Sequence, residues 1–412
     1  MNPSLYNTLL AQIEKMPVID THEHFWYDES DRIEHAHDVL TEYLFQYLRS
    51  DLISSGLKCA AFEQVMDPSG DIMDRWRIVE PYWNYCRHTG YCRALDIAVA
   101  QIYGINGIHT HTIEALSEAH QRNKRHGHHD HVLRDICNIE MCLTDSWTLP
   151  GQGVNPMLKY IHQQSRFIMP GGDTAIDAKH LDQWIDMMEA DMDNALRMHN
   201  VRIIKSALAY SRSLRFDEVK YSEAKSLFND AIKRPISFPK PLQDFMMHSL
   251  LRMANARNLT FQIHTGIQEG NDNTLANSDP SLLNNLFAAY PDVDFDLFHI
   301  GYPYQNVACA LTKVFPNVTV DMCWAHIISP AASMAALDDF LDAIPFNKIS
   351  AFGGDYRFVD GTCGHLQISR ENVTRVLAKK VELGVFDEAR ALEIAHAMYY
   401  DNPKRIFKLD DN

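Results

Sequence analysis

Short apolar runs separated by helix-like segments recur along the chain and predict a repeating strand–helix fold. Amphipathic patterns with helical spacing, such as residues 180–200 and 240–258, lie between most of these runs. Strands that alternate with helices favour a parallel sheet, and eight such units are typical of an α/β protein with a (β/α)8 TIM barrel. The chain is predicted to end in two helices, the first of which begins after Ser369 and ends near Gly384. The eight predicted strands fall within residues 16–24, 137–145, 165–173, 201–210, 259–266, 293–302, 318–326 and 349–356.

The gap between the first and second predicted strands, residues 25–136, is too long for one crossover helix. A structureless loop of that length would be exceptional in a compact protein. The gap contains helix-like stretches, so we expect a barrel formed by residues 1–24 and 137–412 and an inserted helical subdomain at 25–136 near the barrel mouth. Side chains of the insertion, such as Trp26, Arg75 or Arg77, are expected to reach the pocket.

The composition limits the function classes. The 412 residues are 46% hydrophobic and 22% charged, as in globular proteins, and their net charge of −16 disfavours nucleic acid and anionic membranes as partners. The sequence contains no run of 18 apolar residues, so no membrane span is predicted, and the N-terminus lacks the features of a signal peptide. The eight cysteines form no CxxC pair, which is typical of reduced thiols. We therefore expect a cytoplasmic protein that binds a small molecule and could form a homo-oligomer.

Polar side chains gather at the predicted strand ends. In "VIDTHEHFW" (18–26), His22 and His24 lie on the same face of a strand, which also holds Asp20 as a candidate to orient an imidazole. Lys205, His264, His299 and Asp355 follow other predicted strands. The carboxyl ends of barrel strands meet at one mouth, where N and O ligands could hold a divalent metal. Any one of these residues could instead be an ordinary hydrogen-bonding group, but their joint order favours a metal site.

This order of HxH, Lys, His, His and Asp resembles the pattern of the amidohydrolase superfamily. The segments "IIKSALAYSRSL", "IHTGIQEGN", "HIGYPY" and "DNPKRIF" are similar to the amidohydrolase-2-like branch, in particular to the amidohydrolase portion of nodulin/glutamine-synthetase-like proteins. The helical insertion resembles that of the neighbouring uronate isomerases. The resemblance covers about residues 17–24 and 137–408.

The resemblance implies a metal-dependent enzyme, with zinc as the expected metal. His22, His24 and Asp355 would hold the more buried ion, and His264 and His299 a second one, bridged by Lys205 if that lysine is carboxylated. Asp355 would also act as the base, so Asp355, His299 and Lys205 are the expected catalytic residues. In related branches that keep one metal or none tightly bound, the lysine and the sixth-strand histidine serve the substrate instead. One or two ions per chain therefore remain open.

Further polar residues near the strand ends could recognise an anionic substrate, because arginine pairs well with carboxylates. Taken singly, each is more typical of a surface or loop-bracing residue. The candidates for substrate binding are Trp26, Tyr210, Arg212, Arg357 and His365. The histidine-rich segment 125–131 ("RHGHHDH") is expected to lie on an exposed turn without a metal.

Three functions fit these observations. The first is hydrolysis of an amide, lactone or ester bond in a small carboxylate-bearing compound. The second is non-hydrolytic chemistry on the same scaffold, either isomerisation of a sugar acid or decarboxylation. The third, a catalytically idle binding module, is disfavoured because every residue of the expected ligand set is present.

Overall fold

The computed structural model describes the chain apart from residues 1, 147–149, 152–153, 172–175, 234–236 and 410–412. The strands within the described residues pair in parallel in two sheets, in the orders β1-β2-β3 and β4 to β9. They are β1 (Val18–Glu23), β2 (Ile139–Thr144), β3 (Leu158–Tyr160), β4 (His162–Gln163), β5 (Ile203–Ser206), β6 (Thr260–His264), β7 (Phe295–Phe298), β8 (Val318–Asp321) and β9 (Ile349–Ser350).

Backbone hydrogen bonds join the two sheets into a closed barrel. Ile161, which separates β3 from β4, donates its N–H to the carbonyl oxygen of Thr144 at 2.9 Å, so β3 and β4 are two parts of one barrel strand. At the other seam, Thr21 donates to the carbonyl of Phe352 at 3.2 Å and joins β1 to the segment after β9. The sheet thus has eight strand positions, and the predicted (β/α)8 TIM barrel is confirmed.

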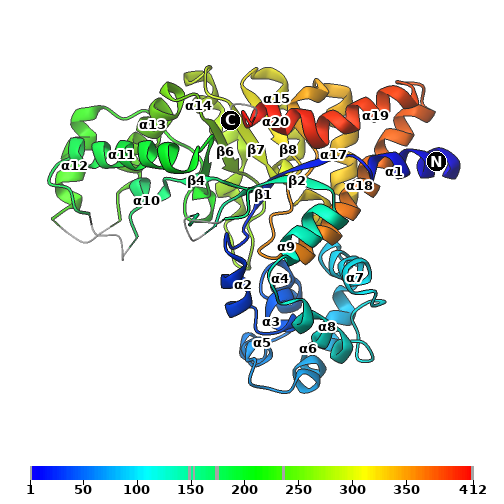
Figure 1. Cartoon of the computed structure of the whole chain (residues 1–412). Helices are drawn as coiled ribbons and strands as arrows, with labels where there is room; N and C mark the ends of the chain where they lie inside the picture. The colour runs from blue at the N-terminus through cyan, green and yellow to red at the C-terminus, as the bar shows by residue number, and fades with distance from the viewer. Residues whose placement is uncertain (1, 147–149, 152–153, 172–175, 234–236, 410–412) are drawn as a thin grey trace.

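Helices cover the outside of the barrel (Figure 1). In α11, the buried side chains of Leu181, Trp184, Met188 and Met192 follow helical spacing and pack in one apolar cluster with Phe261 of β6. Among the helices of the described residues, none is long and apolar enough to cross a membrane. The helices of the barrel part are α1 (Pro3–Ile13), α10 (Ser165–Ile168), α11 (Leu181–His199), α12 (Tyr221–Ala231), α13 (Lys240–Ala256), α14 (Asn284–Ala289), α15 (Gln305–Val314), α16 (Ala325–Ile328), α17 (Pro330–Ala343), α18 (Val359–Glu382), α19 (Glu388–His396) and α20 (Asn402–Ile406).

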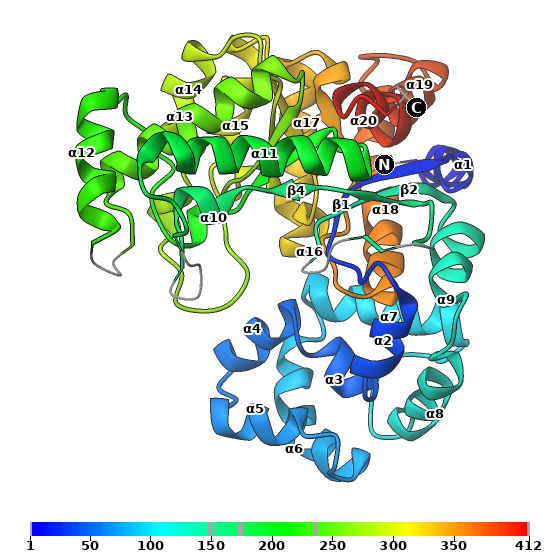
Figure 2. The same ribbon diagram turned by 60° about the vertical axis from the view of Figure 1, so that its left-hand side comes forward.

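The segment between β1 and β2 is helical and forms a separate lobe against the barrel (Figures 1 and 2). Its apolar core contains Trp76 and Trp83 and continues into Phe298, Trp324 and Phe358, which follow or end barrel strands. The lobe therefore packs on the end of the barrel where the strands finish. Its helices are α2 (Glu29–His35), α3 (Val39–Tyr43), α4 (Tyr47–Ser54), α5 (Cys59–Met66), α6 (Ile72–Cys86), α7 (Gly90–Tyr103), α8 (Ile113–Asn123), α9 (His128–Asp130) and a final π-helical turn (His131–Ile136).

Two predicted elements differ from the structure. The third strand was expected at 165–173, but the barrel uses β3 and β4 at 158–163, and α10 begins at Ser165; residues 172–173 lie outside the described residues. The short apolar run "FIM" caused the error, because periodicity cannot separate so short a strand from a buried helical turn. The prediction that a helix begins after Ser369 was also wrong. That residue is buried within α18, where its hydroxyl bonds the backbone oxygen of Ala351.

Candidate metal centre

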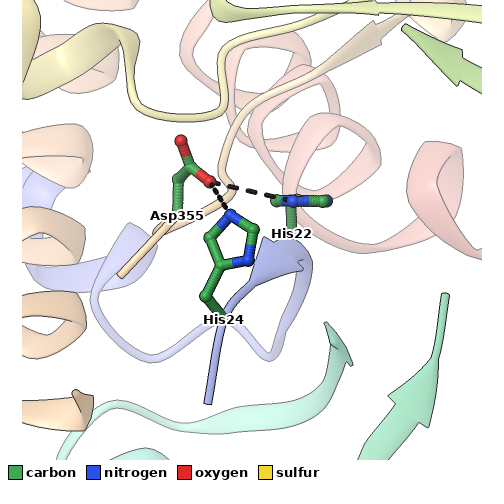
Figure 3. Close-up of side chains that lie close together, drawn as sticks. All are labelled: His22, His24 and Asp355. Carbon is green, nitrogen blue, oxygen red and sulfur yellow. Dashed lines mark ion pairs between the residues drawn. The ribbon is translucent and has the colours of Figure 1, made fainter. Parts of the chain in front are cut away.

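The end of β1 and the segment after β9 bring two histidines and one aspartate together (Figure 3). Nε2 of His24 lies 3.1 Å from Oδ1 of Asp355, and Nε2 of His22 lies 3.8 Å from the same oxygen. The three ligand atoms all lie within 4.8 Å of one another, as a shared metal ion requires. His22 and Asp355 are buried, and His24 is partly exposed toward the mouth.

Hydrogen bonds at Nδ1 fix how three of the predicted histidines present their rings. Nδ1 of His22 lies 2.7 Å from the side-chain oxygen of Gln262, and Nδ1 of His24 lies 2.7 Å from the backbone oxygen of Asp145. Nδ1 of His299 lies 3.0 Å from the backbone oxygen of Cys323. Each partner is an acceptor, so each Nδ1 carries the proton and each Nε2 is left as a lone-pair donor. This is the arrangement in which metal-binding histidines are usually held, and the residues therefore fit a divalent ion.

The imidazole of His299 lies on the other side of Asp355. Its Nε2 is 3.8 Å from Oδ2 of Asp355 and 3.1 Å from Nδ1 of His264, whose own Nε2 is bonded to the backbone oxygen of Ile267 at 2.9 Å. The two oxygens of Asp355 thus face different histidines. The thiol of Cys323 is also close, but burial and the charge of Asp355 raise the pKa of this thiol well above its usual value. A protonated thiol is a poor ligand.

Lys205 forms a buried ion pair that the sequence did not suggest. Its Nζ lies 2.9 Å from Oδ2 of Asp145 and 3.2 Å from Nε2 of His22. Burial alone would raise the pKa of Asp145, but the charge of Lys205 brings it below its usual value. The amide of Gln163 donates to both oxygens of Asp145, at 2.8 and 2.6 Å. The one available signal was that Asp145 ends a predicted strand, as the other site residues do.

Burial sets the protonation of the histidines in the cluster, whereas neighbouring groups set that of Asp355. It lowers the pKa of His22 and His264 well below the usual value, and that of His299 to about 4. Burial alone would raise the pKa of Asp355, but the neighbouring side chains of His24 and His299 bring it well below its usual value. At neutral pH the site therefore presents a carboxylate and at least three neutral imidazoles, the protonation states that metal binding needs.

The backbone of Asp355 is held in a conformation that costs free energy. Its φ of 59° is in the left-handed region, as are those of His299 (68°) and Trp324 (61°). The carbonyl oxygen of Asp355 accepts hydrogen bonds from the side-chain amide of Gln46, at 2.7 Å, and from the hydroxyl of Tyr47. Both donors belong to the inserted lobe, which therefore stabilises the aspartate in position.

A cavity of about 340 Å³, here called the mouth cavity, opens beside these residues. It includes the predicted Tyr210 and Arg357 together with Glu269, Gln46 and Tyr47, which the sequence did not single out. Burial and the charge of Asp355 raise the pKa of Glu269, whereas Arg357 opposes this shift. The lining residues are His24, Gln46, Tyr47, Gln163, Lys205, Ala207, Tyr210, His264, Glu269, Asp355 and Arg357.

A second cavity of about 400 Å³, here called the insertion chamber, adjoins the first. The predicted Trp26 lines this chamber and not the mouth cavity. The chamber is lined by His24, Trp26, Arg32, His35, Ala36, His37, Thr41, Glu42, Phe45, Met66, Arg357 and Phe358.

Other predicted pocket residues are engaged elsewhere. Arg212 donates to Asp244 at 2.6 Å, which braces the loop after β5, and the buried His365 bonds the backbone oxygen of Gly354 at 3.1 Å. Arg75 pairs with Asp38 within the lobe, and the exposed Arg77 pairs with Asp74. These four residues line neither of the two cavities. The sequence shows that an arginine follows a strand, but not which acid it meets.

Two further expectations about polar residues were wrong. His128 and His129 of the segment 125–131 are buried, and Nε2 of His128 lies 2.7 Å from a carboxylate oxygen of Asp360 in α18. This segment therefore connects the lobe to the barrel. Asp20 does not orient an imidazole; it accepts hydrogen bonds from the backbone N–H groups of His22 and Gly354.

Comparisons with known proteins agree with this architecture. The Amidohydrolase family model matches residues 232–409. Protein fluG of Emericella nidulans is 28% identical over 196 residues, which are 46% of this chain and 22% of that protein. The matched region thus spans about a fifth of the length of that curated relative.

Two solved structures share the fold over almost the whole chain. A uronate isomerase from Thermotoga maritima has a TM-score of 0.78 at 16% identity, covering 99% of this chain and 98% of that chain. A candidate metal-dependent hydrolase from Lactobacillus casei has a TM-score of 0.68 at 16% identity, covering 98% of each chain. At such identities the likeness concerns the fold alone. Together with the family match, it confirms the resemblance to the amidohydrolase superfamily.

Proposed function

We propose that this protein is a metal-dependent enzyme that hydrolyses an amide, lactone or ester bond of a small carboxylate-bearing substrate in the mouth cavity. The observation that carries the proposal is the convergence of His22, His24 and Asp355, with both imidazoles fixed through Nδ1 so that Nε2 can bind a metal. The match of residues 232–409 to the Amidohydrolase family supports hydrolysis as the first candidate.

A bound divalent ion would lower the pKa of a water molecule toward 7 and polarise a substrate carbonyl. Asp355, a carboxylate at neutral pH, would hold the ion through the oxygen that faces His24 and can accept a proton from the attacking water through its other oxygen. His299 faces the other oxygen and can hold the neighbouring end of the substrate. Lys205 and Arg357 line the cavity and supply positive charge for a substrate carboxylate.

The ion pair of Lys205 with Asp145 favours one metal ion over two. At 2.9 Å from a carboxylate, Lys205 is stabilised as an ammonium. Carboxylation would turn it into an anion beside Asp145, and the two negative charges would repel each other. We therefore propose a single ion, held by His22, His24 and Asp355, with Lys205 as a cation that serves the substrate. The bridged two-ion site is the alternative.

Isomerisation of a sugar acid is the second candidate. A single metal with a cationic lysine does not require hydrolysis, and the uronate isomerase of Thermotoga maritima shares the fold over 99% of this chain. Decarboxylation on the same scaffold remains a weaker alternative. Substrate turnover, rather than metal content, separates these reactions.

The test has two parts. The protein is loaded with Zn²⁺ or Mn²⁺ and its metal content measured, and N-acyl amino acids, γ-glutamyl compounds, lactones and uronates are then screened for turnover. We expect His22→Ala with His24→Ala to lose metal and activity and to remain folded, because the ligands lie at the rim of a large core.

The chain offers a matched control for this double variant. His109 and His111 form another HxH sequence, in the lobe, and line neither cavity. Replacing both with alanine should leave metal content unchanged. Wild-type metal content in the His22/His24 variant would refute the proposed site, and turnover of uronates alone would replace hydrolysis with isomerisation.

A further inference from the structure

The insertion chamber adjoins the mouth cavity through two shared residues. His24 and Arg357 line both, so the two cavities meet at these residues. The chamber, at about 400 Å³, is no smaller than the mouth cavity at about 340 Å³. A substrate that reacts at Asp355 could therefore extend past His24 into a second compartment.

The chamber wall is rich in aromatic surface. The indole of Trp26 stacks on the ring of His35, with centroids 5.2 Å apart and planes 20° apart. Phe45 has 47% of its surface exposed, although it is a large apolar side chain. Phe358 and Met66 add further apolar surface to the lining. Exposed aromatic faces gathered in a cavity are typical of sites for flat apolar groups.

The charged groups of the wall are satisfied or lie at its border. Arg32 donates two hydrogen bonds to Glu42, at 2.8 and 2.9 Å, and Glu42 is also 2.5 Å from Nε2 of His120. The guanidinium of Arg357 lies 4.6 Å from the ring centre of Phe45, at the border with the mouth cavity. The Arg32–Glu42 pair is thus bonded within the wall, and Arg357 lies where the cavities meet. The rings of Trp26, Phe45 and Phe358 are the large apolar surfaces that remain for a ligand.

We infer that the substrate has two unlike ends, a polar end that reacts at the metal-ligand cluster and an aromatic or similarly apolar group that lies in the insertion chamber. This inference rests on the proposed function and names its substrate class. A polyhydroxylated sugar acid fits the chamber less well than an aromatic group, because hydroxyl groups placed against the rings of Trp26, Phe45 and Phe358 would lose water without gaining hydrogen-bond partners there.

Hydroxamic acids test the inference, since they chelate divalent metals and carry a variable tail. Binding of acetohydroxamic acid, 3-phenylpropanohydroxamic acid and D-gluconohydroxamic acid to the Zn²⁺-loaded full chain is measured by calorimetry. Burying the phenyl group in the chamber should make the phenyl compound bind about 30-fold more tightly than acetohydroxamic acid. The sugar-like compound should bind no more tightly than acetohydroxamic acid.

Variants locate the effect in the chamber. Phe45→Ala removes an aromatic contact from a partly exposed position and should reduce the advantage of the phenyl compound by about tenfold. Met66→Trp should abolish the advantage by filling the space. Tyr85→Ala is the matched control, because Tyr85 is an exposed aromatic residue of the lobe that does not line the chamber.

The outcomes separate the inference from the proposed function. If no hydroxamate binds the Zn²⁺-treated protein, the proposed metal site fails. If all three bind with equal affinity, or the sugar-like compound binds most tightly, the metal site stands and the apolar chamber is refuted. An advantage for the phenyl compound that survives both Phe45→Ala and Met66→Trp also overturns the inference, because the tail then lies elsewhere.

Discussion

The ion pair between Lys205 and Asp145 can be tested by a double-mutant cycle. The perturbations are Lys205→Met, Asp145→Asn and the two together, in protein stripped of metal. Nζ of Lys205 and Oδ2 of Asp145 are 2.9 Å apart, and the two side chains are only 5% and 4% exposed. Removing one partner leaves a charge buried without compensation. Removing both leaves neither charge.

The expected magnitude follows from this burial. Breaking a buried ion pair by removing one partner typically costs about 3–5 kcal/mol of unfolding free energy. We expect each single variant to lose about 3 kcal/mol, with Asp145→Asn somewhat worse because Gln163 also donates to both oxygens of Asp145. The double variant should lose much less than the sum, because it carries no unpaired buried charge.

Urea unfolding followed by tryptophan fluorescence measures these free energies. Arg77 and Asp74 provide a matched control cycle, since their ion pair is exposed by 65% and 72% and should show little coupling. If Asp145→Asn is as stable as the wild type, or more stable, then Asp145 does not stabilise an ammonium at position 205. That result would favour the carboxylated lysine and the two-ion site.

Three further predictions concern catalysis, pH and packing. Asp355→Asn should keep some metal but lose about 10²–10⁴-fold in turnover at saturating metal, because an amide cannot accept the proton; near wild-type turnover would remove Asp355 from the mechanism. Burial lowers the pKa of His326 from 6.5 to about 4, so only the unfolded chain gains this proton between those pH values. The contribution of His326 to the free energy of unfolding is therefore complete above pH 6.5 and falls by about 3 kcal/mol toward pH 4. The free energy of unfolding of His326→Gln should lack this part of the pH dependence. Gly364→Ala should lower the thermal midpoint, because the added methyl group would overlap the carbonyl of Ala94 in α7; an unchanged midpoint would contradict the close packing of α7 on α18.

The strands that carry the candidate ligands could be predicted from the sequence. Short or alternating apolar stretches precede His22, Lys205, His264 and His299 and lie between helix-like segments, so their type and direction followed from local pattern. The structure brings these side chains together with Asp355, as the barrel topology predicts. Their role as metal ligands remains a prediction that metal analysis has to test.

Local pattern could not supply contacts between distant segments. Asp145 ends a strand just as Lys205 does, yet only the closed barrel shows that the two form a pair. Arg212 looked like a substrate ligand by its position, but Asp244 in α13 binds it instead. The order of residues along the chain determines which groups reach the mouth, whereas the partner that each group meets depends on helices that lie far away in sequence.

The contacts of the inserted lobe with Asp355 could not be predicted from the sequence. Gln46 and Tyr47 hold the carbonyl of Asp355 from more than 300 positions away, so the lobe fixes the backbone of a candidate catalytic residue as well as lining the insertion chamber. The metal-ligand cluster is built from the barrel alone, whereas most of the insertion chamber is built from the lobe. We therefore expect changes in the lobe that spare Gln46 and Tyr47 to alter substrate choice more than metal binding. This division is consistent with a common fold that supports different reactions through the segments added to it.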